Sequence, residues 1–357
     1  RGAEPGEFSR RAYMNGRLDL AAAEGIADLI ASSSRAAHRL ALQQTRGVFS
    51  RQFNSLRDKL IELASLLELE LDFSEEDVEF ADRSSLLKTS GELLQNIDRL
   101  TKSYSSGRAF KEGVPVVIAG LPNVGKSTLL NTLLEDDKAI VSDIPGTTRD
   151  IIEDTCEIDG VLFRFIDTAG LRESTDRIEN IGIDLARQRL GQASVILWLF
   201  DPFHSIDEQI EELRSSLDGI SAHQRVIAII TKTNAPGMTD AIISDSRQRI
   251  SGAGISATTC LEISAAEGNG IDQLRDMLRK CATQEYDPEK EIVLTNARHY
   301  GDLLKAGTAL RRAINQIEAG TSADFIAMDI REATAALSSL TGTITTPDLL
   351  NSIFSQF

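Results

Sequence analysis

The sequence predicts an α/β domain with a mostly parallel sheet, inserted into a discontinuous all-helical domain. Three observations lead to this fold class. Apolar residues recur with helical spacing over residues 18–71 and again over 292–354. Between these stretches, short β-branched runs alternate with helical segments, as in sheets wound by right-handed crossovers. Gly107 and Gly113 break the helical pattern just before the first β-branched run, so the inserted domain is expected to begin there.

The helical domain is predicted in two halves. Residues 56–71, LRDKLIELASLLELEL, carry apolar side chains at i, i+3, i+4 and i+7, and residues 84–102 have a similar pattern. After the inserted domain, the helical pattern covers residues 297–320, 322–340 and 346–354. We therefore assign residues 21–112 and 286–357 to the two halves, and residues 113–285 to the inserted domain.

The inserted domain contains a series of expected strands. VPVVIAG (114–120) is a β-branched run that ends in glycine, which is typical of a buried parallel strand. Residues 155–167 predict a hairpin that turns at Asp159-Gly160. Further buried strands are expected within residues 193–201, 225–232 and 258–265.

The charge and cysteine content of the chain argue against some classes of function. The 357 residues include 54 acidic and 38 basic side chains, so the formal net charge is −16. Such a surface argues against broad nonspecific binding to nucleic acid or anionic membranes, although a local basic patch or a basic partner would still bring RNA to it. The three cysteines lack metal-ligand spacing and fit a reducing, cytoplasmic location. No apolar run reaches membrane-spanning length, and the first residue is Arg, which suggests a fragment.

The strongest motif is GLPNVGKST (120–128), which fits G-x-x-x-x-G-K-[ST] between an expected strand and an expected helix. Gly120 and Gly125 let the backbone turn its N–H groups toward phosphate oxygens. Lys126 would neutralise the β- and γ-phosphates, and the Ser127 hydroxyl would bind Mg²⁺. The remaining predicted nucleotide contacts in this loop are Asn123, Val124 and Thr128.

Two later segments have the order expected of GTPase switch loops. SDIPGTTRD (142–150) is a polar loop that offers a threonine to Mg²⁺. DTAG (167–170) ends a strand, where Asp167 would hold the Mg²⁺ shell and the Gly170 N–H would meet the γ-phosphate. Thr168 and Ala169 complete the predicted contacts of this segment. Many GTPases place Gln after this glycine to orient water, whereas Leu171 has no polar group for that task.

A base-reading box is expected at TKTN (231–234), where GTPases usually carry Asn-Lys-x-Asp. Lys232 would lay its aliphatic stem over the purine, and Thr231 keeps a hydroxyl where asparagine usually ties the box to the phosphate loop. In ISAAEG (263–268), the Ala265 N–H would donate to guanine O6, with Ser264 and Ala266 beside it.

Asn234 is the main departure from that box. Its amide offers one acceptor, and its NH₂ would face a guanine N–H, which costs about 1–3 kcal/mol if a donor stays unpaired. Xanthine, with a carbonyl at C2, would pair better with this amide. We therefore expect GTP to be bound with relaxed base selectivity.

Taken together, these motifs resemble the MnmE (TrmE) family of tRNA-modifying GTPases, over essentially the whole chain. PGEFSRRAYMNGRLDLAAAEGIADLI (5–30) resembles the family's segment between its folate-binding and helical domains. IPGTTRD and DTAGLRES…IENIGI resemble its switches, and DLLNSIFSQF resembles its C-terminus. The resemblance implies a Ras-like P-loop GTPase domain inserted into a helical domain.

The resemblance also implies a reaction and its partners. Members of the family act as homodimers with the flavoprotein MnmG, and install an aminomethyl-type group at C5 of the tRNA wobble uridine. A tetrahydrofolate derivative, of the 5-formyl or methylene type, supplies the carbon, and GTP hydrolysis drives conformational cycling. Hydrolysis in the family uses K⁺, Mg²⁺ and dimerisation of the GTPase domains.

Several positions acquire roles only through the resemblance. The expected K⁺ ligands are Asn123, Ser142, Ile144 and Thr147. Thr148 matches the Mg²⁺-binding threonine, and Glu179 matches the glutamate that orients the attacking water. Glu179 would thereby supply what Leu171 lacks.

The chain departs from the family pattern at both ends. Residues 1–20 are expected to be a remnant of the folate-binding domain and its connector, and Arg17 stands at a folate-contacting lysine position. An arginine there keeps the charge and changes the geometry. The family's C-terminal Cys-Ile-Gly-Lys, which carries its proposed reactive thiol, does not follow Phe357. Truncation or disorder is the expected explanation.

Two other functions are compatible with parts of the sequence. A regulatory or ribosome-assembly GTPase gains from Leu171, which favours slow turnover, and loses because such proteins usually carry a basic RNA-binding appendage. An ATPase or another P-loop enzyme is disfavoured by the series DTAG, TKTN and ISA.

Overall fold

The computed structural model describes residues 2–72, 83–135, 153–167, 188–217, 224–254, 259–284, 287 and 291–342. The chain divides into two compact units. One comprises residues 1–111 and 286–357, and the other comprises residues 112–285. This division confirms that an α/β unit is inserted into a discontinuous helical one. The assignment of residues 1–20 to a remnant of another domain stays a prediction.

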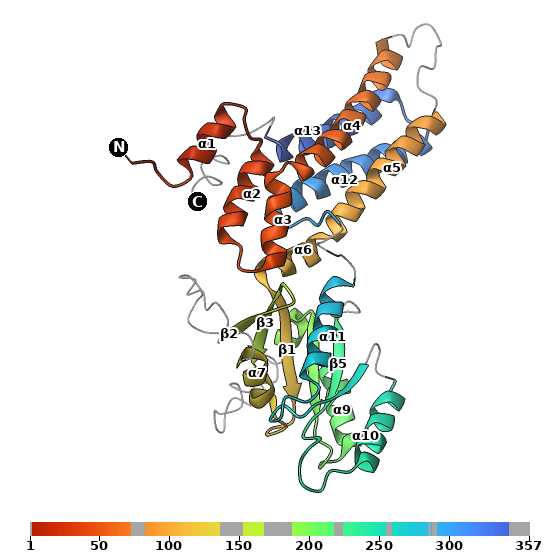
Figure 1. Ribbon diagram of the computed structural model, residues 1–357. Helices are drawn as coiled ribbons and strands as arrows, with labels where there is room; N and C mark the ends of the chain where they lie inside the picture. Colours follow the sequence, from red (N-terminus) through yellow and green to blue (C-terminus); the bar gives the residue numbers. More distant parts are fainter. Residues whose placement is uncertain are drawn as a thin grey trace, which may run out of the picture. The chain divides into compact units, whose positions relative to one another are not determined.

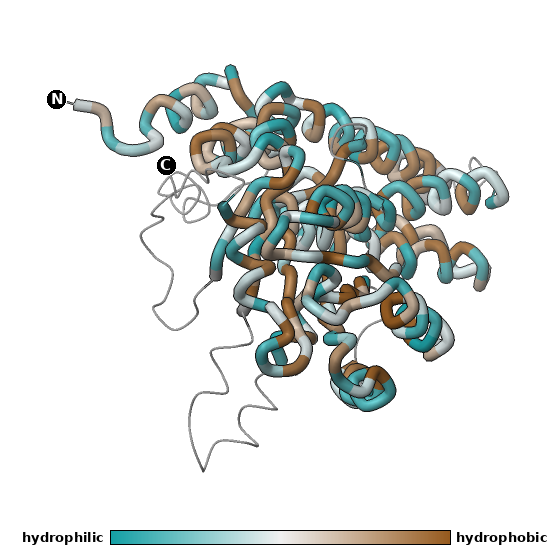
Figure 2. Tube along the Cα trace, turned by 60° about the horizontal axis from the view of Figure 1, so that its bottom comes forward, coloured by the Kyte–Doolittle hydropathy of each residue, from teal (hydrophilic) through white to brown (hydrophobic). Residues whose placement is uncertain are grey.

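The helical unit is built from helices of two separate chain segments (Figure 1). The first segment forms α1 (Glu7–Met14), α2 (Leu20–Ala31), α3 (Arg35–Thr45), α4 (Val48–Asp72), α5 (Arg83–Lys102) and α6 (Tyr104–Glu112). The second forms α12 (Ala297–Glu318) and α13 (Ala323–Leu340). Figure 2 shows these helices changing between hydrophilic and hydrophobic residues within each turn, as amphipathic helices do.

Polar caps divide the helical stretch predicted over residues 18–71 into separate helices. The Asp19 carboxylate accepts a hydrogen bond from the Ala22 N–H at 2.8 Å, at the start of α2. The Ser34 hydroxyl accepts one from the Ala37 N–H at 3.2 Å, at the start of α3. Such caps satisfy first-turn N–H groups that have no partner within the helix.

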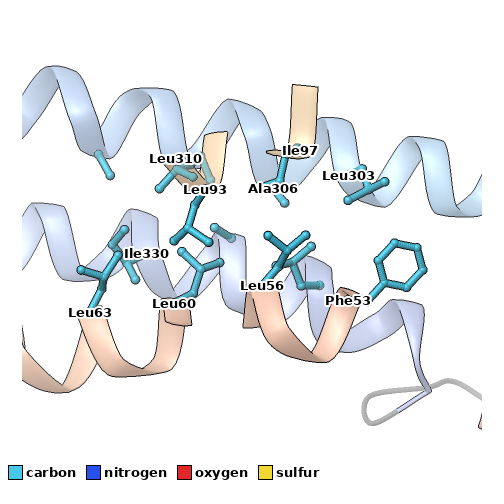
Figure 3. Close-up of a cluster of buried hydrophobic side chains, with 14 of the residues drawn as sticks. Phe53, Leu56, Leu60, Leu63, Leu93, Ile97, Leu303, Ala306, Leu310 and Ile330 are labelled. Carbon is cyan, nitrogen blue, oxygen red and sulfur yellow. The ribbon is translucent and has the colours of Figure 1, made fainter. Parts of the chain in front are cut away.

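Four helices, α4, α5, α12 and α13, enclose the core of this unit. Apolar side chains from all four interdigitate in Figure 3, where Leu60 of α4, Leu93 of α5, Leu310 of α12 and Ile330 of α13 lie close together. All four are at most 1% exposed. The long-range packing therefore joins chain segments that lie on either side of the inserted unit.

The expectation that Gly107 ends the helical pattern is wrong, because Gly107 lies inside α6. A Cβ at this position would overlap the carbonyl oxygen of Leu294, and it would lie 2.8 Å from the carbonyl carbon. Gly107 is therefore needed for the close approach of α6 to the segment that precedes α12.

A buried ion-pair cluster fastens α2 to α12 in the same unit. Glu24 of α2 is 5% exposed, and its carboxylate accepts two 2.8 Å hydrogen bonds from Arg298 Nε and Nη2. His299 Nε2 lies 2.8 Å from Glu24 Oε2. Arg298 Nη1 also donates to the Ser339 carbonyl at 3.0 Å, near the end of α13. Burial would raise the pKa of Glu24, but hydrogen bonds and charges from His299 and Arg298 outweigh it and lower the pKa from 4.5 to about 2.

The inserted unit contains a six-stranded sheet in the order β2-β3-β1-β4-β5-β6. Its strands are β1 (Val114–Gly120), β2 (Glu153–Ile158), β3 (Val161–Asp167), β4 (Val195–Phe200), β5 (Arg225–Ile230) and β6 (Thr259–Glu262). Only the β2–β3 pair is antiparallel among the described strands, and the predicted turn at Asp159-Gly160 joins it. Both turn residues have positive φ, 51° and 89°, as a two-residue hairpin of type I′ requires.

Helices pack against this sheet as expected for a wound α/β fold. They are α7 (Lys126–Glu135), α9 (Ile206–Leu217), α10 (Asp240–Gly252) and α11 (Ile271–Thr283). Buried side chains of α9 and α10 form one apolar cluster with β1, β4 and β5, and α7 contacts β1 and β2. Because β1, β3, β4, β5 and β6 run parallel, their carboxyl ends meet at one edge of the sheet, where such folds bind ligands.

No helix within the described residues is long and apolar enough to cross a membrane.

Candidate nucleotide-binding site

The loop between β1 and α7 has the backbone conformation of a phosphate-binding loop. Gly120 has φ 134°, and a Cβ there would lie 2.5 Å from the Leu199 carbonyl oxygen of β4. Gly125 has φ 106°, and Asn123 adopts a left-handed φ of 58°. These conformations favour glycine or asparagine and let successive N–H groups converge on an anion.

Lys126 begins α7 and extends its side chain over this loop. Its ammonium donates to the Gly120 carbonyl at 2.9 Å and to the Leu121 carbonyl at 2.7 Å. Ser127 and Thr128 are exposed in the first turn of α7, whereas Val124 is fully buried and anchors the loop to the interior. The helix N-terminus, an ammonium group and an exposed hydroxyl thus surround one position, which is a suitable site for phosphate.

Asp167 closes β3 beside this loop. Its backbone pairs with Ile118 of β1, two residues before Gly120, so the strand end lies at the same edge of the sheet. Several predicted site residues lie outside the described residues: Ser142, Ile144, Thr147, Thr148, Thr168, Ala169, Gly170, Leu171 and Glu179. Their roles stay predictions.

The base-reading box follows β5 at the same sheet edge. Thr231 is 7% exposed, and its hydroxyl and its N–H both donate to the Phe200 carbonyl at the end of β4, at 3.1 and 2.9 Å. The hydrogen bond that we expected from Thr231 to the phosphate loop is therefore made to β4 instead. Asn234 is exposed, so its amide is accessible to a ligand.

Lys232 holds an uncommon backbone conformation in this box. Its φ is 58°, and it is one of three non-glycine residues with positive φ in the described chain. Asn123 of the phosphate loop is another, and Asp159 of the hairpin turn is the third. Two of the three therefore lie in the candidate site, where backbone strain tends to gather. The Lys232 ammonium lies 2.7 Å from a carboxylate oxygen of Asp201, which follows β4.

The loop after β6 is connected to the phosphate-loop helix. The Thr132 hydroxyl of α7 lies within hydrogen-bond distance of both the Ala265 carbonyl, at 3.0 Å, and the Thr128 carbonyl of its own helix, at 2.9 Å. Ser264 is 2% exposed, and its backbone N–H donates to the Asn269 carbonyl at 3.0 Å, which closes the loop. Within the described residues, the Ala265 N–H donates no backbone hydrogen bond and is open to an acceptor such as guanine O6.

The residues that hold these loops in place were not predicted from the sequence. Asp201 and Gln209 support the base-reading box, and Thr132 joins α7 to the loop after β6. An Asp directly after a buried strand was the available signal for Asp201. Arg17, by contrast, lies in the helical unit, where it is exposed in the turn between α1 and α2.

No cluster of three or more His, Cys, Asp or Glu side chains suited to a metal occurs in the part of the chain that the structure describes.

Comparison with known proteins decides the family. The MnmE helical domain model matches residues 20–357. The chain belongs to the MnmE family. It is 45% identical to the tRNA modification GTPase MnmE of Bacteroides thetaiotaomicron over 99% of this chain and 76% of that protein. It is 46% identical to the MnmE of Cytophaga hutchinsonii over 100% of this chain and 75% of that protein.

Solved structures of GTP-binding proteins also match. Aquifex aeolicus Era bound to GDP and AlF4⁻ is 28% identical, covers 55% of this chain and 66% of its own, and has a TM-score of 0.39. As a member of the MnmE family, the chain is a GTP hydrolase of tRNA modification. The phosphate loop and the base-reading box described above are the parts of the fold suited to that nucleotide.

Proposed function

We propose that this MnmE-family chain is a K⁺-stimulated GTPase acting with an MnmG-like flavoprotein in 5-carboxymethylaminomethyl-type modification of the tRNA wobble uridine. One observation carries the nucleotide part of the proposal. The loop with positive φ at Gly120, Asn123 and Gly125, the Lys126 ammonium and the exposed first turn of α7 converge on one position. This position lies at the sheet edge that also bears the base-reading box.

Phosphate would bring negative charge to the donors of this loop. The Lys126 ammonium donates to two neutral carbonyls of the loop, and a phosphate oxygen would offer it an acceptor of opposite charge. The loop N–H groups are fixed by the backbone, so they need little rearrangement to stabilise negative charge that develops during phosphoryl transfer.

Mg²⁺ and K⁺ fit the oxygen donors of this site. The exposed Ser127 hydroxyl in the first turn of α7 would bind Mg²⁺ together with Thr148, and Asp167 would hold the surrounding shell. The exposed Asn123 amide would bind K⁺ with Ser142, Ile144 and Thr147. When bound, the two cations supply positive charge beside the transferred phosphoryl group.

Glu179 is proposed to orient the attacking water, since the Leu171 side chain has no polar group. A carboxylate within hydrogen-bond reach of that water would accept its proton as the bond to phosphorus forms.

The acidic chain is proposed to reach tRNA as a homodimer with a flavoprotein partner. A formal charge of −16 makes electrostatic capture of tRNA by this chain alone unfavourable. A tetrahydrofolate derivative is proposed as the one-carbon donor, with Arg17 near its site in the full-length protein. A cytoplasmic location follows from this partnership.

The K⁺ proposal is tested by measuring GTP turnover by the full-length protein in KCl and in NaCl at equal ionic strength. We expect markedly faster turnover in KCl, and an Asn123→Ala variant that no longer distinguishes the two salts. Equal rates of the wild-type protein in both salts would contradict the proposal.

The modification proposal is tested by mass analysis of wobble nucleosides in tRNA from a strain that lacks this gene. We expect the C5-modified uridine to disappear. An unchanged nucleoside profile would instead support a switch whose output is binding alone, the alternative that the family assignment disfavours.

A further inference from the structure

We propose that Asp201 is a positioning residue for purine binding, because it holds the Lys232 side chain in the conformation in which its methylene groups would contact the base. The inference rests on the proposed guanine nucleotide site. Asp201 follows β4, and its Oδ2 lies 2.7 Å from the Lys232 ammonium. The Asp201 side chain is 3% exposed and that of Lys232 is 37% exposed. A buried carboxylate thus anchors the far end of a lysine whose side chain is partly exposed.

The Asp201 carboxylate is itself held rigidly. Its Oδ1 accepts the Phe203 N–H at 3.0 Å, which closes a tight turn after β4. The buried Gln209 side chain of α9 clamps the Asp201 backbone from both sides, accepting its N–H at 2.9 Å and donating to its carbonyl at 2.9 Å. His204 Nε2 lies 3.7 Å from Oδ2, beyond direct hydrogen-bond distance. The carboxylate therefore has a fixed place and one charged partner within hydrogen-bond distance among the described residues.

Lys232 needs such an anchor because its side chain is long and flexible. A free lysine side chain carries about 2 kcal/mol of rotamer entropy, which binding must overcome if the chain is ordered only by the ligand. Here the left-handed backbone fixes one end, and Asp201 fixes the other. Thr231 secures the same segment to β4 by donating twice to the Phe200 carbonyl. The methylene groups between these ends form a prepared apolar surface for a purine face.

The role predicted for Asp201 differs from that of the residues that read the base edge. Contact with a ring face does not depend on the substituents at C2 or C6, so it supports guanine and xanthine alike. Asn234 and Ala265, in contrast, would discriminate between those bases through hydrogen bonds. Loss of the Asp201–Lys232 contact should thus weaken the binding of all purine nucleotides by the same factor. The binding of a ligand that has phosphate groups and no base should not change.

Asp201→Asn is the most informative variant, because Asn keeps the Oδ1 acceptor for the Phe203 N–H and removes the charge that holds Lys232. Dissociation constants for GDP, XDP and inorganic tripolyphosphate are measured by calorimetry on the full chain. We expect the affinities for GDP and XDP both to fall about five- to tenfold, and the affinity for tripolyphosphate to stay unchanged. An unchanged GDP affinity, an altered ratio of GDP to XDP affinity, or an equal loss for tripolyphosphate would each overturn the proposal.

Two further variants separate this role from a general effect on the fold. Lys232→Met keeps the apolar stem and needs no anchor, so adding Asp201→Asn to it should cause no further loss of GDP affinity. A further tenfold loss in the double variant would overturn the proposal. Asp207→Asn is the matched control, because it removes the same charge from the exposed pair of Asp207 with Arg249. It should bind all three ligands like the wild-type protein.

The fluorescence of Trp198, which lies on β4 and is the chain's single tryptophan, checks that each variant is folded. If the wild-type protein itself does not bind GDP, the proposed function fails. If it binds and Asp201→Asn binds equally well, only the positioning role fails.

Discussion

Replacing Glu24 by Gln removes the charge at the centre of the buried cluster that joins α2 to α12. The Glu24 pKa lies at about 2, against 4.5 for an ordinary carboxyl. At about 1.36 kcal/mol per pH unit, this difference corresponds to about 3 kcal/mol of stability at neutral pH. Because the folded-state pKa is the lower one, that stability is complete above pH 5 and is lost as the pH falls from 4.5 toward 2. We expect Glu24→Gln to lower the free energy of unfolding by this amount at pH 7.

Urea unfolding followed by far-UV circular dichroism measures this loss, at pH 7 and again at pH 3. The difference between Glu24→Gln and the wild-type protein should shrink to about 1 kcal/mol at pH 3, because the Glu24 carboxyl of the unfolded chain is then mostly protonated, whereas that of the folded protein is still mostly ionised. Glu68→Gln is the matched control, because Glu68 pairs with Arg331 on the surface of the same unit. It should cost less than about 1 kcal/mol. A Glu24→Gln effect as small as that of the control, or one of equal size at both pH values, would refute the reasoning.

Three other substitutions test separate parts of the structure. Asn234→Asp should tighten GDP binding about ten- to hundredfold and raise selectivity for GDP over XDP, because a carboxylate accepts both guanine donors. Calorimetry with both nucleotides measures this change. If the wild-type protein already prefers GDP by several orders of magnitude, the expectation of relaxed selectivity is contradicted. Gly107→Ala should destabilise the helical unit by about 1–3 kcal/mol in urea, because its Cβ would overlap the Leu294 carbonyl. Its control, Gly91→Ala within α5, meets no atom within 4 Å and should be neutral or stabilising. Glu179→Ala should leave GDP affinity intact and reduce GTP turnover by orders of magnitude, and a near-normal rate would exclude its assigned role.

The fold was predictable where the sequence pattern is local. β-branched runs marked the buried strands, and Asp159-Gly160 marked the hairpin because both of its residues adopt positive φ. The phosphate loop was predictable for a similar reason, since its spacing of glycines, lysine and serine follows from the shape of the anion that it binds.

Features that depend on distant contacts were not predictable from local pattern. Gly107 appeared to break a helix, because its close approach to Leu294 arises only after the two halves of the helical unit have packed. Glu24 and Arg298 are 274 residues apart, and neither has a local pattern that indicates the other. The contacts that hold the base-reading box, from Lys232 to Asp201, likewise join the ends of two neighbouring strands.

The most direct test of the whole account links the phosphate loop to tRNA modification in one experiment. A strain that lacks this gene is supplied with the full-length protein, either wild type or carrying Lys126→Ala, and the wobble nucleosides of its tRNA are measured by mass spectrometry. We predict that the wild-type protein restores the C5-modified uridine and that Lys126→Ala, present at the same level, restores none. Full restoration by Lys126→Ala would contradict the claim that GTP hydrolysis at this loop drives the modification.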